Sequence, residues 1–539
     1  MNKKLIFRAP DFLILLIIFH LIGNIVWIKL NNIPPAWDEA VNTKFSFGFY
    51  HFSQNIFYGH FDLKQMVSLF SDYYGPLIRI LTSLMFFIFF PSIKLAQFTG
   101  TIFFLLSLLM IYFITKELYK SQWIALMATF IFSFYQAVYN YSRWLLLDIP
   151  LTFFILLTVF LLIKSEFFTN RKYTLLSFIG LGLSILTKFQ AIIYLSIPFG
   201  YILFLSIKNK YKLLNNVILG SLTTFLLVFP WLIVSIDKLR FYFTFASSAK
   251  PFVDPSDLFD LTTWFHNLKL FIDYDISFFI FVFFVISLVF FLKHKNKYKN
   301  FILILIILTY IIFTIFPSKD LRFLFPILPF TAIIFAVGFR EFYLRAQNIT
   351  LFLLPSIIIF NFVMYLSLSF GFPFQKGIRK HIDLPYIKDI VYFNLSDYPV
   401  QIYDSRYWPV SEIVNAIDIE SKQKPIDIVF LPNYNNFNGN TFSMYAEYKD
   451  KTYINIIGAE GRQRFSDAGE VKEYLKNKDY FIYTPNEVGV FYQIDKQAFE
   501  QIQKTITRNL YLNRVLILEK WQLPTGQDIY LVKKIVQFD

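Results

Sequence analysis

Residues 171–212 read RKYTLLSFIGLGLSILTKFQAIIYLSIPFGYILFLSIKNKYK and contain two apolar runs, 174–187 and 190–207. A helix needs roughly 20 apolar residues to cross a bilayer, so the second run is nearly long enough and the first has to borrow flanking residues. Basic clusters lie at both ends of the stretch, as is typical of cytoplasmic loops. The stretch therefore predicts a helical hairpin in a membrane, with Lys188 at its outer tip.

The composition of the whole chain agrees with this interpretation. Of its 539 residues, 56% are hydrophobic and only 16% are charged, whereas a typical soluble domain is roughly 45–50% apolar. We therefore expect an integral membrane protein. The chain contains no cysteine, which excludes disulfides, cysteine-ligated zinc, iron–sulfur clusters and thiol catalysis.

Similar apolar runs recur through the first 370 residues and predict about eleven transmembrane helices. The first run follows three basic residues, as a signal peptide does, but it is longer and lacks a small-residue cleavage site, so we expect an uncleaved anchor. A shorter apolar stretch, 76–90, contains Arg79, and we expect it to lie on the membrane surface. The eleven runs are 12–30, 95–115, 123–140, 149–163, 174–187, 190–207, 213–235, 274–292, 301–317, 325–343 and 349–370.

The distribution of charge predicts the topology. Residues 371–539 contain 21 basic and 21 acidic residues, so the net charge of +14 lies entirely in residues 1–370. With the N-terminus in the cytoplasm, the cytoplasmic segments hold 17 basic and 4 acidic residues, and the outer segments of residues 1–370 hold 13 and 12. Because cytoplasmic loops accumulate Lys and Arg, this split favours that orientation. We attribute the positive charge to topology and membrane lipids rather than to nucleic acid, and we expect the plasma (inner) membrane.

Two domains follow from these patterns. Residues 1–370 form the predicted transmembrane domain, whose first outer loop, 31–94, includes the surface helix 76–90. Residues 371–539 alternate strand-like runs such as IDIVFL (426–431) with helix-like segments, which predicts an α/β domain. We interpret that domain as an extracytoplasmic cap without chemistry of its own. The predicted fold class is therefore mainly α, a polytopic membrane protein with a C-terminal extracytoplasmic α/β domain.

Two adjacent carboxylates follow the first predicted helix, in PPAWDEAVNTKF (34–45). A carboxylate at the membrane interface can act as a general base, accept a hydrogen bond or bind a cation. The alternative is structural: Asp38 caps a helix and Glu39 favours the positive end of its dipole. Spacing alone favours the helix cap.

A second acidic residue, Asp148, stands at the start of the apolar run IPLTFFILL, where an ionisable group is costly. Its default interpretation is therefore functional. Arg143 lies five residues earlier on the same predicted outer side. The alternative is that Arg143 pairs with Asp148 or anchors the interface, and the residues leave the two interpretations balanced.

Cations also lie at two outer turns. Lys188 either extends its amine to the lipid headgroups or holds a phosphate from the hairpin tip. The segment PSKDLRFLFPILPF (317–330) adds Lys319 and Arg322, and arginine is suited to bidentate phosphate binding. Because no nucleotide-binding glycine loop occurs, this set of groups favours a substrate whose phosphate is already in the membrane. The triplet Asp273-Tyr274-Asp275 matches the D-x-D of metal-dependent sugar transferases only weakly.

Six loose motifs follow one another over roughly residues 10–345. They are WDEA (37–40), YYGPL (73–77), RWLLLDIP (143–150), GLSILTKF (182–189), FPWLIV (229–234) and DLRFLFPILP (320–329). In their order and spacing the chain resembles the polytopic GT-C glycosyltransferases, specifically the branch of the protein O-mannosyltransferases and the lipid A aminoarabinose transferases. The resemblance implies inverting transfer of a sugar from a polyprenyl-phosphate donor to a lipid, glycan or protein hydroxyl at the outer face of the membrane.

The resemblance also implies roles for single residues. The family's catalytic carboxylate in the first outer loop falls on Asp38, with Glu39 beside it, and its later aspartate falls on Asp148. The hairpin lysine falls on Lys188, and the arginine before the tenth predicted helix falls on Arg322.

An inverting displacement needs a base for the acceptor hydroxyl and cations for the departing lipid phosphate. Asp38 is the natural base. A divalent metal is optional and no cofactor is certain, because Lys188, Arg322 and Arg143 can neutralise the phosphate without one.

The chain also departs from the family pattern. Aminoarabinose transferases have a lysine directly before the proline that opens the short segment, whereas this chain has Gly75, which argues against aminoarabinose and lipid A as substrates. The W-W-D motif of oligosaccharyltransferases is absent. The main rival function is a transporter or flippase of lipid-linked sugars, but transporters typically carry internal repeats and none is found. A receptor anchored by its helices would not need eleven crossings.

Overall fold

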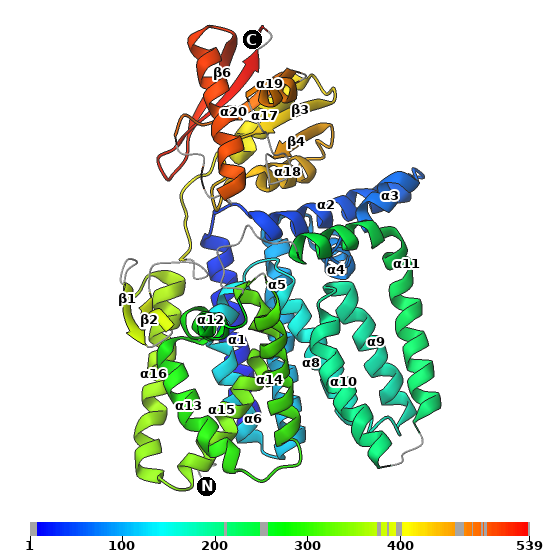
Figure 1. Cartoon of the computed structure of the whole chain (residues 1–539), viewed down its shortest axis with the longest axis vertical. Helices are drawn as coiled ribbons and strands as arrows, with labels where there is room; N and C mark the ends of the chain where they lie inside the picture. The colour runs from blue at the N-terminus through cyan, green and yellow to red at the C-terminus, as the bar shows by residue number, and fades with distance from the viewer. Residues whose placement is uncertain are drawn as a thin grey trace, which may run out of the picture.

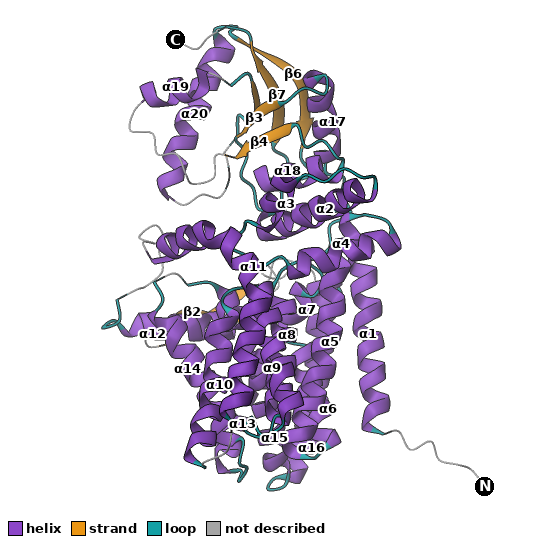
Figure 2. Cartoon of the chain, turned by 90° about the vertical axis from the view of Figure 1, so that its right-hand side faces the viewer, coloured by secondary structure: helices purple, strands orange, loops and turns teal. Residues whose placement is uncertain are grey.

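The computed structural model shows a mostly helical chain with a small β-sheet unit at one end (Figure 1). Most helices stand side by side in an upright bundle, and the sheet unit lies above one end of it (Figures 1 and 2). We call that end the sheet end of the bundle. The structure describes residues 8–209, 213–247, 257–317, 319–374, 379–384, 387–394, 402–458, 468–476, 478–486, 489 and 493–536.

The apolar runs of the sequence fall on helices. Three runs are divided between two elements: 123–140 between α6 and α7, 274–292 between η1 and α13, and 325–343 between η2 and α15. The elements of the bundle are α1 (Ala9–Leu30), α5 (Ile93–Tyr119), α6 (Gln122–Ser133), α7 (Gln136–Tyr141), α8 (Asp148–Lys164), α9 (Arg171–Thr187), α10 (Ala191–Lys208), α11 (Leu214–Ser247), α12 (Leu261–Leu270), the π-helical turn η1 (Phe271–Ile276), α13 (Phe278–Lys293), α14 (Lys299–Ile315), the 3-10 turn η2 (Leu321–Ile327), α15 (Leu328–Tyr343) and α16 (Gln347–Phe370).

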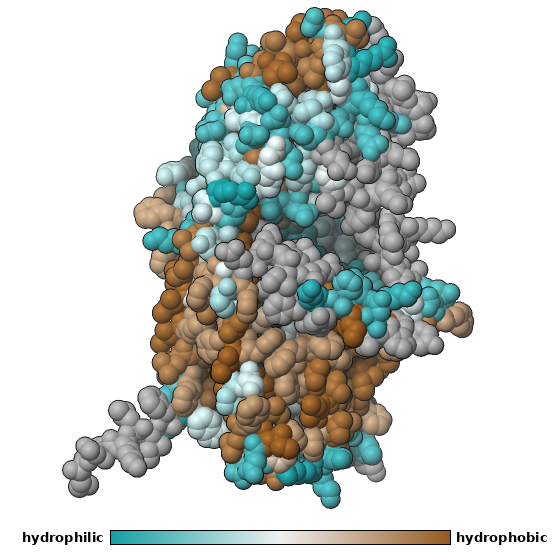
Figure 3. Space-filling view, turned by 90° about the vertical axis from the view of Figure 1, so that its left-hand side faces the viewer, coloured by the Kyte–Doolittle hydropathy of each residue, from teal (hydrophilic) through white to brown (hydrophobic). Residues whose placement is uncertain are grey.

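The bundle is suited to a membrane. Within the described ranges, six helices are long and apolar enough to cross a bilayer, or seven if the bent pair formed by Leu261–Ile276 and Phe278–Lys293 is one span. Brown apolar side chains cover much of the upright bundle, and teal polar ones gather at its lower end (Figure 3). The chain therefore has the surface of an integral membrane protein, whereas the number of about eleven crossings stays a prediction.

Three helices of the first predicted outer loop lie at the sheet end. Helices α2 (Trp37–Phe57) and α3 (Leu63–Phe70) run across the bundle in Figure 1, and α4 (Leu77–Phe89) follows them. Pro34 and Pro35 separate α1 from α2, because proline cannot continue a helix that still needs its N–H. Helix α4 has only 13 residues, too few to cross a bilayer of ordinary thickness; its place on the membrane surface stays a prediction.

The C-terminal residues form a five-stranded sheet in the order β4-β3-β5-β7-β6. Strand β3 pairs in parallel with β4 and β5, and β7 pairs antiparallel with β5 and β6. A separate antiparallel pair, β1 with β2, precedes the sheet. The bounds are β1 (Arg379–Leu384), β2 (Ile387–Asn394), α17 (Val410–Ser421), β3 (Ile426–Phe430), α18 (Gly439–Tyr448), β4 (Ile454–Gly458), α19 (Ala468–Lys476), β5 (Tyr480–Tyr483), α20 (Gln493–Tyr511), β6 (Val515–Gln522) and β7 (Asp528–Lys534).

Helices cover both faces of this sheet. Along β3, Ile428 and Phe430 pack into one apolar cluster with α17 and α18, whereas Val429 packs into a second cluster with α19 and α20. This follows from the two-residue period of a strand, which sends successive side chains to opposite faces. The sheet unit rests on α2: the Thr441 hydroxyl at the start of α18 donates to the Pro35 carbonyl at 2.9 Å. The division of the chain at residue 370 stays a prediction.

Candidate active site

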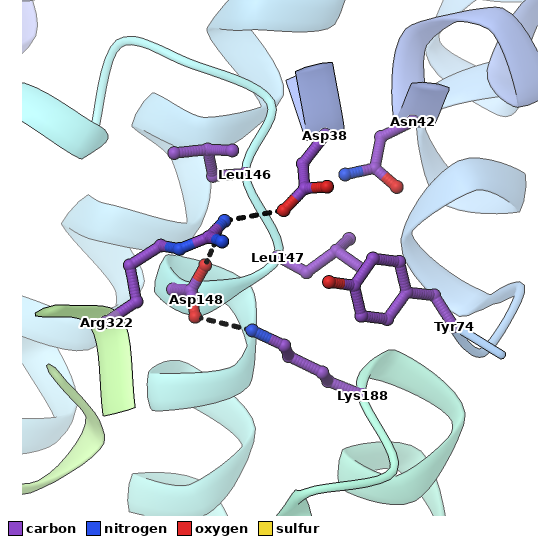
Figure 4. A pocket seen from close by; sticks show the side chains of 8 residues that line it. All are labelled: Asp38, Asn42, Tyr74, Leu146, Leu147, Asp148, Lys188 and Arg322. Carbon is purple, nitrogen blue, oxygen red and sulfur yellow. Dashed lines mark hydrogen bonds and ion pairs between the residues drawn. The ribbon is translucent and has the colours of Figure 1, made fainter. Parts of the chain in front are cut away.

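A small pocket lies where four elements of the chain begin or end (Figure 4). Asp38 comes from the first turn of α2, Asp148 opens α8, Lys188 follows the last residue of α9, and Arg322 lies in η2. These four predicted residues are separated widely in the sequence and are brought together here. The full lining is Asp38, Asn42, Tyr74, Leu146, Leu147, Asp148, Lys188 and Arg322.

Asp38 contacts a cation and does not cap its helix. Helix α2 begins at Trp37 with Ala36 at the cap position, and Ala36 makes no side-chain cap. The Asp38 carboxylate lies 2.6 Å from Arg322 Nη1. The cap interpretation, which spacing alone favoured, is therefore wrong. Trp37 has a left-handed φ of 49°, a conformation that side chains other than glycine adopt rarely and that often marks functional sites.

Asp148 and Lys188 form a buried ion pair. Asp148 Oδ1 lies 2.8 Å from Lys188 Nζ, and the two residues are only 2% and 5% exposed. The second oxygen, Oδ2, lies 3.9 Å from Arg322 Nη1 and accepts no hydrogen bond from any described residue. A buried carboxylate with one open acceptor position can take a hydrogen bond from a ligand.

Arg322 lies at the centre of this charge cluster. Besides Asp38, it contacts Asp320, whose carboxylate accepts from Nε at 3.0 Å and from Nη2 at 2.8 Å. Burial raises the pKa of Asp320, but the guanidinium of Arg322 outweighs burial and lowers that pKa to about 2. Asp320 is therefore ionised and fixes the orientation of Arg322. The cluster contains one carboxyl group more than it contains cations, so an incoming phosphate competes with carboxylates for Arg322 and Lys188.

Two predicted site residues lie outside the pocket. Glu39 does not line the pocket; it is buried and accepts a hydrogen bond from Gln97 of α5 at 3.0 Å. Burial raises the pKa of Glu39 to about 7, although hydrogen bonds from Gln97 and the Leu145 backbone oppose the rise. Successive helical residues point about 100° apart, so Asp38 and Glu39 cannot both face the pocket.

Arg143 is also buried elsewhere. Its guanidinium donates to Asn24 at 3.0 Å and to Ser369 at 2.8 Å, and it packs against the Trp27 and Tyr365 rings. Within the described residues no carboxylate pairs with it, so of the alternatives that the residues left open, the pairing with Asp148 is wrong. Arg143 joins α1, α16 and the segment after α7, which is a structural role. Nothing in this geometry brings it to a phosphate in the pocket.

Other residues of the site were not singled out from the sequence. Asn42 lies one helical turn after Asp38, and residues four positions apart share a helix face, so this spacing could have identified Asn42 as a neighbour of Asp38. Tyr74 belongs to the quoted motif YYGPL, and Asp320 lies two residues before Arg322. Gly75 is needed for close approach: a Cβ there would collide with the backbone carbonyl of Leu186, two residues before Lys188. Lys319 contacts the carbonyls that end α14 instead.

The described residues contain no group of three His, Asp or Glu side chains placed to hold a metal ion. Asp273, the first acid of the D-x-D triplet, is paired with Lys269 at 2.7 Å and accepts from the Val391 N–H at 2.9 Å. Its contacts join η1 to β2 and α12. Asp273 therefore stabilises the fold at this position, and no residue of the triplet lines the pocket.

Comparison with known proteins bears on this arrangement. Residues 37–239 match the family model described as dolichyl-phosphate-mannose-protein mannosyltransferase. The predicted resemblance to this branch of the GT-C glycosyltransferases is confirmed. The matched segment includes Asp38, Asp148 and Lys188, but it ends before Arg322. No curated protein matches the sequence.

Two solved structures share the fold over nearly the whole chain. The apo structure of ArnT from Cupriavidus metallidurans has a TM-score of 0.61 and 13% sequence identity, and the alignment covers 98% of each chain. The structure of ArnT from the same organism bound to undecaprenyl phosphate has a TM-score of 0.57 and 10% identity, covering 97% of this chain and 98% of the other. The chain thus has the ArnT fold, including its C-terminal part.

Proposed function

We propose that this protein is a membrane glycosyltransferase that moves a sugar, with inversion, from a polyprenyl-phosphate donor to a hydroxyl acceptor at the outer face of the membrane. The observation that carries the proposal is the continuous set of contacts from Asp38 through Arg322 and Asp148 to Lys188. It supplies a base and two cations within one pocket. The mannosyltransferase family match and the fold shared with a protein that binds undecaprenyl phosphate support the same class of donor.

The proposed reaction is a single displacement. The acceptor oxygen forms a bond to the anomeric carbon while the bond from that carbon to the phosphate oxygen breaks, and polyprenyl phosphate leaves with the electron pair. Asp38 takes the proton of the acceptor hydroxyl, which a positioned carboxylate can do. Arg322 and Lys188 stabilise the negative charge that develops on the leaving phosphate. This electrostatic stabilisation of the transition state is largest in a site from which water is excluded.

Donor binding also prepares the base. In the structure, the Asp38 carboxylate is held by Arg322 Nη1 at 2.6 Å, and an oxygen engaged by a guanidinium is not free to accept the proton of the acceptor hydroxyl. The donor phosphate takes the same guanidinium, since arginine binds phosphate in bidentate geometry. Asp38 is thereby released toward the acceptor. Asp320, held to the other side of Arg322 at Nε and Nη2, keeps the guanidinium in place during the exchange.

The direct experiment is transfer of labelled sugar by the purified protein. A panel of undecaprenyl-phosphate sugars is incubated with lipid, glycan and protein acceptors, and the product is identified by mass spectrometry. The control is the Asp38→Asn protein, which lacks the base. A flippase would instead move the labelled lipid across reconstituted vesicles without forming a new glycosidic bond, and its rate would not depend on Asp38. That outcome would replace the transferase proposal.

A further inference from the structure

A fully buried arginine lies inside the short apolar helix α4. Arg79 is 0% exposed, although it follows Pro76 by less than one helical turn and most of its neighbours in the helix are apolar. Its Nη2 lies 2.6 Å from Asp72 Oδ2, and its guanidinium packs 4.2 Å from the centre of the Phe45 ring. Burying a charge is costly even when the charge is paired. Holding α4 in place is therefore not a sufficient reason for a charged side chain at position 79.

Arg79 also contacts Asn42, which lines the pocket. Nε and Nη2 both donate to Asn42 Oδ1, at 3.2 and 3.1 Å. Two donors on the same oxygen fix which way the Asn42 amide is turned, because the flipped amide would place its own donors against the guanidinium. The amide nitrogen Nδ2 is therefore directed at the Leu145 carbonyl, to which it donates at 3.2 Å.

The Leu145 carbonyl belongs to the segment that delivers Asp148. Leu146 and Leu147 line the pocket, and Asp148 is the next residue, the first of α8. Asn42 itself is 1% exposed and lines the pocket beside Tyr74. A bond from Asn42 to Leu145 thus sets the distance between α2, which carries Asp38, and the start of α8.

We propose that Arg79 is a positioning residue of this site: it orients Asn42, and Asn42 holds the Leu145 carbonyl so that Asp148 and Asp38 keep a fixed separation around Arg322. This inference rests on the proposed function, because it assigns Arg79 a role in the same pocket. Arg79 does not line the pocket. It reaches the pocket through its two hydrogen bonds to Asn42, and its guanidinium also lies 6.0 Å from the centre of the Tyr74 ring. A displacement of about 1 Å at a reacting group can lower a rate by ~10²-fold.

The test compares four single variants and the double variant Arg79→Met/Asn42→Asp with the wild type, all full-length and in the same detergent. Arg79→Met removes the guanidinium. Arg79→Lys retains the positive charge but not the two N–H groups, Nε and Nη2, that donate to Asn42. Asn42→Asp keeps an acceptor for Arg79 but replaces the donor that faces the Leu145 carbonyl with an oxygen. The matched control is Thr82→Val. Thr82 is a buried polar residue of the same helix, and within the described residues its hydroxyl bonds only to the Ile78 carbonyl of α4, at 2.8 Å.

Two measurements are made on each protein: the affinity for undecaprenyl phosphate and the turnover of sugar transfer per folded molecule. We expect Arg79→Met and Asn42→Asp to lower turnover by about 10- to 100-fold. The affinity of Arg79→Met should change by less than about threefold, because Arg322 and Lys188 remain. Thr82→Val should keep both values, and Arg79→Lys should recover part of the turnover. The double variant should be no slower than the slower single one, because both changes break the same contact.

The outcomes separate the two proposals. If the wild type neither binds undecaprenyl phosphate nor transfers sugar, the proposed function fails. If the wild type does both and the folded Asn42→Asp protein turns over normally, the positioning role of Arg79 is refuted. Asn42→Asp retains the pair between Arg79 and its acceptor, so it answers the question even where Arg79→Met does not fold. Additive losses in the double variant would also contradict the proposal.

Discussion

Asp38 and Arg322 lie 284 positions apart in the sequence, and the carboxylate of one is 2.6 Å from the guanidinium of the other. This pair joins the first turn of α2 to η2 across the bundle. It places the proposed base and the proposed phosphate ligand in direct contact. Replacing either partner should therefore affect catalysis and donor binding differently.

Asp38→Asn should abolish sugar transfer without weakening donor binding. An amide cannot take the acceptor proton, and loss of a general base typically lowers a rate by ~10²–10⁴-fold. The same change frees Arg322 from a competing carboxylate, so affinity for undecaprenyl phosphate should be equal or higher. Transfer assays and lipid-binding measurements on the purified variant check both parts. Near-native transfer by a well-folded Asp38→Asn protein would remove Asp38 from the mechanism.

Replacing Lys188 or Arg322 should weaken use of the donor. The leaving phosphate loses a charge-assisted hydrogen bond in a site where water cannot fully restore it. Arg322→Lys should also weaken donor use, because an ammonium cannot reproduce the planar set of N–H donors with which a guanidinium binds Asp320 and a phosphate at the same time. The effect should appear in the donor KM and donor affinity more than in the acceptor KM. Lys238→Met, which changes an exposed lysine of α11, is the control and should behave as wild type.

Glu39→Gln should affect stability with a defined dependence on pH. The pKa of Glu39 is about 7 in the folded protein and near 4.5 when unfolded, so the folded state binds more protons between these values. The wild type therefore loses stability as pH rises from 4.5 to 7, by about 3 kcal/mol for this group alone. Glutamine does not ionise, so the variant should be more stable relative to wild type at pH 8 than at pH 5. Thermal unfolding in detergent at both pH values measures this.

The loss of sugar transfer in Glu39→Gln should be smaller than in Asp38→Asn. Glu39 is buried beside Gln97, whereas Asp38 lines the pocket. Equal losses of transfer in the two variants, with both proteins folded, would contradict the assignment of catalysis to Asp38 and of a structural role to Glu39.

Introduced cysteines can test the topology, because the chain has none of its own. A cysteine at exposed Tyr511 of the sheet unit should react with an impermeant thiol reagent in intact cells. Tyr58 and Lys94 lie on either side of α4 and are exposed; cysteines at both should react if residues 76–90 do not cross. A cysteine at exposed Lys295 should react only after permeabilisation. Protection of the Tyr511 position would overturn the predicted orientation.

The positions and lengths of many helices depend on neighbouring residues and could be predicted from the sequence. Each apolar run became helix because its own residues exclude water and satisfy their backbone within the segment. Lys188 lies between α9 and α10, where the hairpin pattern predicted it, because a charged residue between two apolar runs marks their boundary. The short length of α4 was likewise visible in residues 76–90.

Only the tertiary structure decided which charged residues meet. Asp38 and Glu39 are neighbours in sequence, yet the helical turn between them sends one into the pocket and the other to Gln97. Arg143 lies five residues before Asp148 but contacts Asn24 and Ser369 instead. Helix formation depends on residues a few positions apart, so the sequence by itself determined the helices and their apolar faces. The pairing of Asp38 with Arg322 depends on how the helices pack against one another, and no spacing along the chain encodes that.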